Sequence, residues 1–179
     1  EMNWNRALAG CALIVTIAVS QLAGAPLQVP FFTQKKNGCG AASAAMVLHY
    51  WSEALPGRTT APPSPEEVYQ QLYRKDLKGV RLSDIRHYLE EMRFRAFTFR
   101  GKWANVDEQL AKGRPIIVGL RPSPTKPMHF VVVAGAEDGR VWLNDPTRRK
   151  ASQLPQDKFE KQWTMADRWM LLAIPLGSE

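Results

Sequence analysis

Cys39 is the residue whose surroundings in this sequence point most clearly to chemistry. It stands between Gly38 and Gly40 in the stretch QKKNGCGAASAAMVLHYW, residues 34–51, and small and apolar residues follow it. Such a run predicts a helix that is buried on most sides and begins at the cysteine. A thiol at a helix N-terminus lies near free backbone N–H groups and the positive end of the helix dipole, which favour the reactive thiolate. The two glycines would let a substrate carbonyl approach closely.

A cysteine in this position could be a packing residue, one end of a disulfide, a metal ligand or a nucleophile. The sequence has two cysteines, and the other one, Cys11, lies in an apolar N-terminal stretch, so the folded domain holds no disulfide partner for Cys39. A structural zinc site needs several Cys or His ligands, and neither a CxxC nor an HExxH motif is present. We therefore expect no metal and no cofactor, and packing and nucleophilic roles stay open.

A nucleophilic cysteine needs a base, and the sequence offers three histidines. His49 lies ten residues along the predicted helix, about 15 Å from the thiol at 1.5 Å per residue, so it cannot reach. His87 falls on the polar side of an amphipathic helix. His129 begins an apolar strand directly after a proline-rich loop, where a side chain emerges at the rim of a sheet. It is the predicted general base and acid.

The base in turn needs an acceptor for its second ring N–H, and the strand after the next turn ends in Asn144 and Asp145. A two-residue turn at 138–139 would place Asn144 opposite Val133, on the face of His129. A three-residue loop, EDG, would instead place Asp145 on that face. The glycine in the third place of the loop favours Asp145, without excluding Asn144.

Gln34 precedes the cysteine by five positions. A side-chain amide at this place could donate a hydrogen bond to the oxyanion of a tetrahedral intermediate, together with the backbone N–H of Cys39. Taken alone, it could equally be a solvated loop glutamine.

The elements that must position these residues follow from hydrophobic periodicity and from capping signals. The first half of the sequence predicts an extended entry segment at 27–34 and a half-buried strand at 93–99. It also predicts four helices, at 40–51, at 64–75, from residue 83 onward and at 105–112. Ser64, Pro65 and Glu67 form the start of the second helix as a capping box. The second half predicts antiparallel strands at 115–120, 128–136, 140–145 and 168–174, with a short helix near 155–163. The fold class is therefore α+β.

The chain carries a formal net charge of +7, but its lysines and arginines are scattered. The one tight cluster is TRRK, 147–150, without interleaved aromatic residues, so no nucleic-acid partner is expected. Residues 1–25 hold Arg6 followed by an apolar run that is typical of a signal peptide or an uncleaved signal anchor. We expect residues 26–179 to be an exported domain, on the periplasmic face of a bacterial inner membrane or in the periplasm.

Together, the glutamine, the Cys-Gly pair that opens a small-residue helix, the strand HFVVVAG, the following strand that ends in DP and a last tryptophan-containing strand resemble the C39-like cysteine peptidases. The resemblance covers about 28–175. It implies a papain-like fold, with Cys39 as nucleophile, His129 as general base, Asp145 as orienting acid and Gln34 as oxyanion donor. The family includes the double-glycine leader peptidases of bacteriocin exporters. It places its third catalytic member in this Asp-Pro pair, which strengthens Asp145 over Asn144.

The sequence departs from the family pattern beside the cysteine. Many members carry an acidic residue or asparagine just before it and a proline soon after, where this chain has Gly38 and Ala41. No transporter region follows, so we expect a free-standing, exported peptidase that acts on a protein or peptide. A catalytically inactive, membrane-tethered peptide-binding protein is the alternative, and an acyl transferase or amidase is a third possibility.

Overall fold

The computed structural model describes residues 25–57, 59–148 and 152–178. The hydrophobic segment expected at 1–25 lies outside these residues apart from Ala25. Within the described ranges, no helix combines the length and the apolar character that crossing a membrane requires.

The described residues form five helices, two of them in the second half of the chain. The helices are α1 (Cys39–Ala54), α2 (Pro65–Leu72), α3 (Leu82–Glu91), α4 (Trp103–Ala111) and α5 (Gln156–Met165). The strands are β1 (Tyr73–Arg74), β2 (Gly79–Val80), β3 (Phe94–Arg100), β4 (Ile116–Leu120), β5 (His129–Glu137), β6 (Arg140–Asn144), β7 (Ser152–Pro155) and β8 (Trp169–Pro175). Six strands form one antiparallel sheet in the order β3-β8-β4-β5-β6-β7, and β1 and β2 form a small ribbon. This is the α+β arrangement that the sequence predicts.

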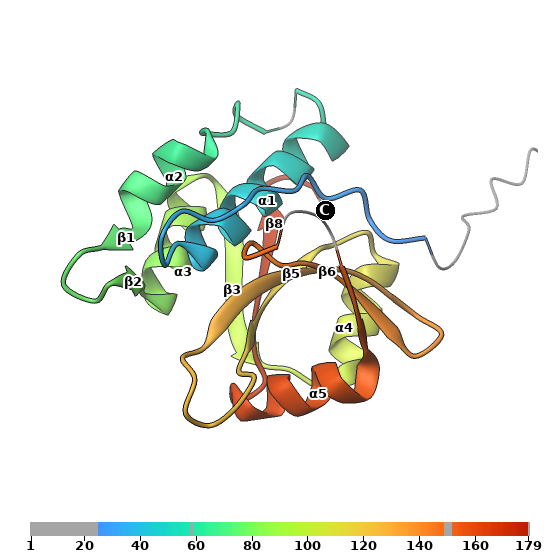
Figure 1. Ribbon diagram of the computed structural model, residues 1–179. Helices are drawn as coiled ribbons and strands as arrows, with labels where there is room; N and C mark the ends of the chain where they lie inside the picture. Colours follow the sequence, from blue (N-terminus) through green and yellow to red (C-terminus); the bar gives the residue numbers. More distant parts are fainter. Residues whose placement is uncertain (1–24, 58, 149–151, 179) are drawn as a thin grey trace, which may run out of the picture.

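The sheet has helices on both faces, as Figure 1 shows, with α1, α2 and α3 on one side and α4 and α5 on the other. Neighbouring residues of β4 point to opposite faces because side chains alternate along a strand. Ile117 packs in the core beneath α1, and Ile116 packs in the core beneath α4 and α5. All five residues of β4 are buried, so this strand reads as a continuous apolar run and not as an alternating one.

α1 is the central helix of the first core, as expected. Residues 40–48 are all buried along it, and its polar Ser43 is buried with them. Trp51 near its end donates its indole N–H to the carbonyl oxygen of Ala173 on β8 at 3.0 Å. The C-terminal end of the helix is therefore fixed against the sheet, and Cys39 lies at its N-terminal end.

The capping box of α2 is present as predicted, with reciprocal hydrogen bonds between Ser64 and Glu67. The predicted end of that helix, near Lys75, is wrong, because α2 ends at Leu72. The next two residues leave the helix to pair with β2 as an antiparallel ribbon, a tertiary pairing that overrides local helix propensity. The sequence also did not predict β7, a short strand on the edge beside β6.

The turn between β5 and β6 corrects a second prediction. It has two residues, Asp138 and Gly139, both with positive φ (49° and 69°), and not the three-residue EDG loop. The register then shifts by one place between Val133 and Gly135, at a β-bulge. Beyond the bulge Asn144 lies opposite Val132, so the strand reaches the register that a three-residue loop would have given.

Candidate active site

Cys39 is the first residue of α1, directly after the N-cap residue Gly38. No side chain caps this helix end and its first turn holds no acidic residue. The backbone N–H groups that a helix leaves without internal partners therefore face the thiol without a competing side chain. The thiol is partly buried, and it is a free thiol among the described residues.

The two flanking glycines lie against neighbouring side chains. A Cβ on Gly38 would lie 2.7 Å from the ring of Tyr69, and a Cβ on Gly40 would lie 2.8 Å from the side chain of Ile85. Both positions therefore let neighbouring elements approach the start of α1 closely. The expectation that the glycines let a substrate carbonyl approach stays a prediction.

The turn that leads into Cys39 is held by α2. Gly38 donates its backbone N–H to the carbonyl oxygen of Lys35 at 2.9 Å, and Asn37 between them has a φ of 55°. Tyr69 on α2 donates its hydroxyl to the carbonyl oxygen of Lys36 at 3.1 Å. Lys35 also forms an ion pair with Glu66, and both side chains are exposed. The position of the thiol thus depends on contacts with a second helix.

His129 is the first residue of β5 and meets both Cys39 and Asp145. Its Nε2 lies 2.6 Å from Oδ1 of Asp145, and its ring also hydrogen-bonds with the Cys39 side chain. Because Nε2 is occupied by Asp145, Nδ1 is the nitrogen that faces the thiol. The other two histidines are not part of this group: His49 contacts the carbonyl oxygen of Pro63, and His87 is exposed on α3.

Hydrogen bonding raises the pKa of His129 although burial opposes this. Burial alone disfavours the imidazolium, but the hydrogen bonds to Asp145 and Cys39, with their charges, raise its pKa to about 9. The imidazolium is therefore the stable form of this residue at neutral pH.

The pKa of Cys39 is lowered by the same contacts. Burial disfavours the thiolate, but the hydrogen bond from His129, backbone hydrogen bonds from Phe130 and Gly40, and the charge of His129 outweigh it. The pKa of the thiol thus lies below its ordinary value. A thiolate–imidazolium pair is the arrangement that these two shifts favour.

Asp145 follows β6 and accepts several hydrogen bonds through one carboxylate. Thr147 donates to its Oδ1 from the backbone N–H at 3.0 Å and from the hydroxyl at 2.7 Å, in addition to the contact with His129. Arg148 lies 3.6 Å from Oδ2. Burial raises the pKa of this carboxyl, but its hydrogen bonds with His129 and Thr147 outweigh that and lower the pKa to about 2. Asp145 is therefore ionised at neutral pH.

The structure separates the two residues that sequence left as alternatives. Asp145 contacts His129, whereas Asn144 is buried and donates its side-chain amide to the carbonyl oxygens of Val29 (2.9 Å) and Pro30 (3.4 Å). Asn144 therefore anchors the entry segment, which the sequence gave no reason to expect.

Gln34 lies at the end of that entry segment. Its backbone N–H donates to the carbonyl oxygen of Pro146 at 2.9 Å, which places it beside the residue that follows Asp145. Its side-chain Oε1 is buried and has no hydrogen-bond partner among the described residues. The structure thus brings Gln34 to the segment that carries Asp145, and its oxyanion role stays a prediction.

The comparisons with known proteins bear on this arrangement. A family model described as the Peptidase_C39 like family matches residues 26–169. The chain belongs to the C39-like peptidase family. No curated protein sequence matches it significantly.

Solved structures of C39 peptidases share its fold. A double-glycine motif protease from an AMS/PCAT transporter, solved in complex with a leader peptide, has 23% identity and a TM-score of 0.60, covering 84% of this chain and 94% of that one. A putative C39-like peptidase from Bacillus anthracis has 17% identity and a TM-score of 0.60 over 82% and 94%. The peptidase domain of Streptococcus ComA, a bifunctional ABC transporter involved in quorum sensing, has 16% identity and a TM-score of 0.62 over 82% and 98%.

Two contacts of this C39-like site were missed from the sequence. Thr147 follows Asp145 by two positions, and an Asp-Pro-Thr run is a recognisable signal for an aspartate that bonds to the backbone two residues on. Tyr69 has no such signal, because its role depends on how α2 packs against the 35–38 turn. Among the residues that the structure describes, no group of three or more His, Cys, Asp or Glu could hold a metal.

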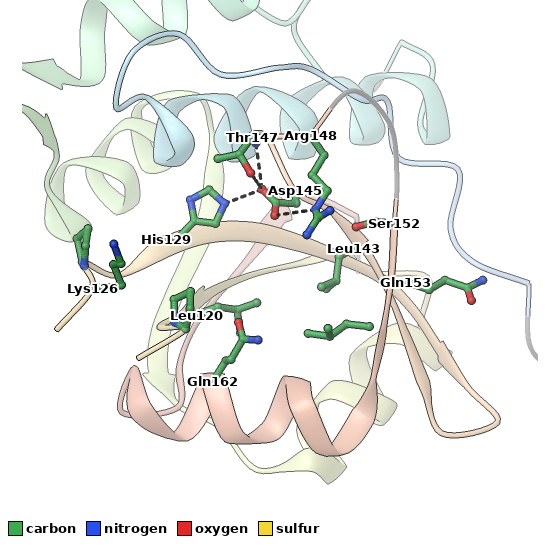
Figure 2. A pocket seen from close by; sticks show the side chains of 13 residues that line it. Leu120, Lys126, His129, Leu143, Asp145, Thr147, Arg148, Ser152, Gln153 and Gln162 are labelled. Atoms are coloured by element: carbon green, nitrogen blue, oxygen red, sulfur yellow. Dashed lines mark hydrogen bonds and ion pairs between the residues drawn. The ribbon is translucent and has the colours of Figure 1, made fainter. Parts of the chain in front are cut away.

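A pocket of about 520 Å³ opens beside the His129–Asp145 pair. Figure 2 shows it between the start of β5, the turn after β6 and α5, with Gln162 pointing into it from the helix. The residues that line it are Leu120, Pro122, Lys126, Pro127, His129, Leu143, Asp145, Thr147, Arg148, Ser152, Gln153, Leu154 and Gln162. Cys39 is not one of them.

Proposed function

We propose that this C39-like family member is an active cysteine peptidase that hydrolyses a peptide bond in another exported protein or peptide. Cys39 is the nucleophile, His129 the general base and acid, and Asp145 the residue that orients and charges the imidazole. The observation that carries the proposal is the continuous hydrogen-bonded series from Asp145 through His129 to Cys39.

The reaction follows from the protonation states of this series. The Cys39 thiolate attacks the substrate carbonyl carbon and forms a C–S bond, and the carbonyl oxygen becomes an oxyanion. When the C–N bond breaks, the imidazolium of His129 gives its proton to the leaving amine, and an acyl thioester remains on Cys39. Water then attacks the thioester while His129 accepts its proton, which releases the acid and restores the thiolate. Asp145 keeps Nε2 hydrogen-bonded, so the ring stays oriented with Nδ1 toward the sulfur.

The oxyanion requires donors that are in place before the reaction. We assign this role to the side-chain amide of Gln34 and the backbone N–H of Cys39. The assignment is supported by the position of Gln34, which its backbone bond to Pro146 holds beside the catalytic aspartate. The N-terminus of α1 adds a positive potential at the same place.

The substrate class and the location are part of the proposal. The similar double-glycine motif protease was solved with a leader peptide, which supports a peptide segment as the substrate class here. The apolar run within residues 1–25, after Arg6, supports export to the periplasm or to the periplasmic face of the inner membrane, with the N-terminal segment as a membrane anchor.

A peptide library tests the proposal without knowledge of the natural substrate. Peptides prepared from the exported proteins of a bacterium are incubated with the full chain, and new termini are identified by mass spectrometry. We expect cleavage by the wild type, none by Cys39→Ala or His129→Ala, and wild-type cleavage by His87→Ala, which removes an exposed histidine outside the site. If the wild type binds peptides but cleaves none, the peptide-binding alternative is correct. Cleavage by Cys39→Ala would contradict the mechanism.

A further inference from the structure

The pocket of about 520 Å³ beside His129 and Asp145 is not used by the steps above. We propose that it binds the part of the substrate that follows the cleaved bond, and that it selects a carboxylate there. This inference rests on the proposed peptidase function. It adds a substrate preference on the side of the leaving amine.

The direction of the substrate follows from proton transfer. The leaving nitrogen must lie within hydrogen-bond reach of the ring of His129, whereas the acyl carbon is bonded to Cys39. The chain that follows that nitrogen therefore extends past His129, away from the thiol. The pocket has His129 and Asp145 in its wall and lacks Cys39, so it lies where this chain must go (Figure 2).

The lining of the pocket predicts an apolar contact. Its volume falls in the range of small-ligand pockets, roughly 300–1,000 Å³, and is sufficient for the side chains of a short peptide. Its apolar wall comes from β4, β6 and β7 and from the loop before His129. These residues are Leu120, Pro122, Pro127, Leu143 and Leu154. A leucine-sized side chain on the leaving fragment would bury its surface against them.

The charges of the pocket predict a carboxylate. Its charged side chains are Lys126, Asp145 and Arg148, and His129 adds a positive charge only while it is an imidazolium, before it gives its proton to the leaving amine. Two basic side chains thus face one carboxylate. The carboxylate of Asp145 is already engaged by His129 and Thr147, and Arg148 lies 3.6 Å from its Oδ2, so Lys126 is the cation of the pocket that Asp145 does not pair with. Figure 2 shows Lys126 and Arg148 on opposite sides of the His129–Asp145 pair. A substrate carboxylate in this pocket would lie between cations, whether it comes from an acidic side chain or from a chain terminus.

Acyl transfer measures this preference directly. p-Nitrophenyl acetate acylates Cys39 with release of p-nitrophenol. An added dipeptide amine then attacks the acetyl thioester in place of water, His129 takes the amine proton, and the thiolate leaves, giving an N-acetyl dipeptide. Three nucleophiles compete at equal concentration: Leu-Gln amide, Leu-Glu amide and Leu-Gln with a free carboxylate. The N-acetyl products are quantified by mass spectrometry, with Cys39→Ala as the blank.

We expect a carboxylate-bearing nucleophile to be acetylated about two- to fivefold more than Leu-Gln amide, the gain expected for an exposed charge pair. If Leu-Glu amide leads, the carboxylate belongs to a side chain, and if free Leu-Gln leads, it belongs to a chain terminus. Lys126→Gln should abolish most of the preference, whereas Lys75→Gln, which removes an exposed lysine from the turn after β1, should keep it.

Two failures are distinguishable. If the wild type is acylated but all three nucleophiles react equally, the inference about the pocket is wrong and the peptidase proposal stands. A preference that survives in Lys126→Gln also overturns the inference. If the wild type shows no acylation above the Cys39→Ala blank, the proposed function fails, and the inference that rests on it fails with it.

Discussion

Asn144 and Val29 are 115 positions apart in the sequence and are joined by a hydrogen bond of 2.9 Å from a side-chain amide to a backbone carbonyl. Asn144 directly precedes Asp145, and Val29 belongs to the entry segment that leads to Gln34. A backbone hydrogen bond, from the N–H of Gln34 to the carbonyl oxygen of Pro146 at 2.9 Å, joins the same two segments further along. The carboxylate that contacts His129 and the residue whose amide is proposed for the oxyanion are thus held by one pair of segments.

Replacement of Asn144 by alanine tests this relationship. The change removes the donor that the partly buried carbonyl oxygens of Val29 and Pro30 share, and we expect it to lower the free energy of unfolding by about 1–3 kcal/mol. Urea unfolding measures this loss. Gln28→Ala removes an exposed amide with a local bond and should cost under about 0.5 kcal/mol. Equal stability of the two variants would contradict an anchoring role for Asn144.

The pKa of Cys39 predicts how fast the thiol reacts at different pH values. Because the pKa lies below its ordinary value of 9.0, iodoacetamide should alkylate Cys39 with a midpoint below pH 9.0. His129→Ala removes the hydrogen bond and the charge that favour the thiolate, so its midpoint should move to higher pH. Peptide mapping separates Cys39 from Cys11. The same midpoint in both proteins would show that His129 does not interact with the thiol.

The pKa values of His129 and Asp145 predict a pH window for stability. His129 has a raised pKa, so its contribution is complete below pH 6.5 and is lost as the pH rises through about 9. Asp145 has a lowered pKa, so its contribution is present above pH 3.8 and is lost as the pH falls through about 2. The His129–Asp145 hydrogen bond contributes to both shifts, so this pair is most stabilising between about pH 4 and pH 6.5.

Asp145→Asn measures this window. The difference in unfolding free energy between wild type and variant should be largest near pH 5–6 and should shrink toward pH 9.5, where His129 becomes neutral. Asp76→Asn changes an exposed carboxylate whose nearest cation is 3.7 Å away, so its effect should be small and nearly constant over this range. If the difference in unfolding free energy between wild type and Asp145→Asn does not change with pH, an ion pair between His129 and Asp145 is excluded.

The architecture was predictable because the long elements carry local signals, either a periodic pattern or a continuous apolar run. The helix after Cys39 and the strand β4 are continuous apolar runs that are buried on most sides, and β3 begins with buried and exposed residues in alternation. The β1–β2 ribbon and β7 could not be predicted, since strands of two and four residues are formed by pairing with neighbours and not by local propensity.

The sequence led to three residues that the structure brings together, Cys39, His129 and Asp145, but not to the geometry that joins them. Counting histidines leads to His129, and the sequence places Asp145 near it. The reason given for Asp145, a three-residue loop, is wrong, because the one-place shift comes from a bulge near Gly135. A bulge depends on what packs against the strand, here the entry segment. Its signal in the sequence is a lone glycine inside a strand, which has several possible meanings.

The entry segment packs closely against Gly135, beside the bulge, and this predicts the effect of a methyl group there. A Cβ there would lie 2.9 Å from the backbone Cα of Pro26, and Leu27 next to it donates to the carbonyl oxygen of Ala134 at 2.7 Å. Because the nearest atom belongs to the backbone, relief of this contact requires the entry segment itself to shift, so Gly135→Ala should displace that segment and lower stability by about 1–3 kcal/mol. Thermal unfolding measures the loss.

Gly139→Ala is the matched control for Gly135→Ala. Position 139 has a φ of 69° and nothing within 4 Å of a Cβ, so alanine there strains the turn by about 1–2 kcal/mol without touching another segment. Both variants should lower the melting temperature, but only Gly135→Ala should also reduce peptidase activity per folded molecule. If folded Gly135→Ala keeps full activity, the position of the entry segment does not affect catalysis.

Gln34 gives the most direct test of the oxyanion assignment. If its amide donates to the oxyanion, Gln34→Ala should lower kcat about 10²–10³-fold with little change in KM, because the bond forms only in the transition state. The pH midpoint for alkylation of Cys39 should stay near that of the wild type, since Gln34 is not among the groups that shift the thiol pKa. Gln34→Glu places a carboxylate where negative charge develops, so it should be at least as inactive as the alanine variant. Gln71→Ala, an exposed glutamine on α2, should leave both kinetic constants unchanged. A Gln34→Ala enzyme that keeps its kcat would assign the oxyanion to backbone N–H groups alone, and Gln34 would then be a structural residue of the entry segment.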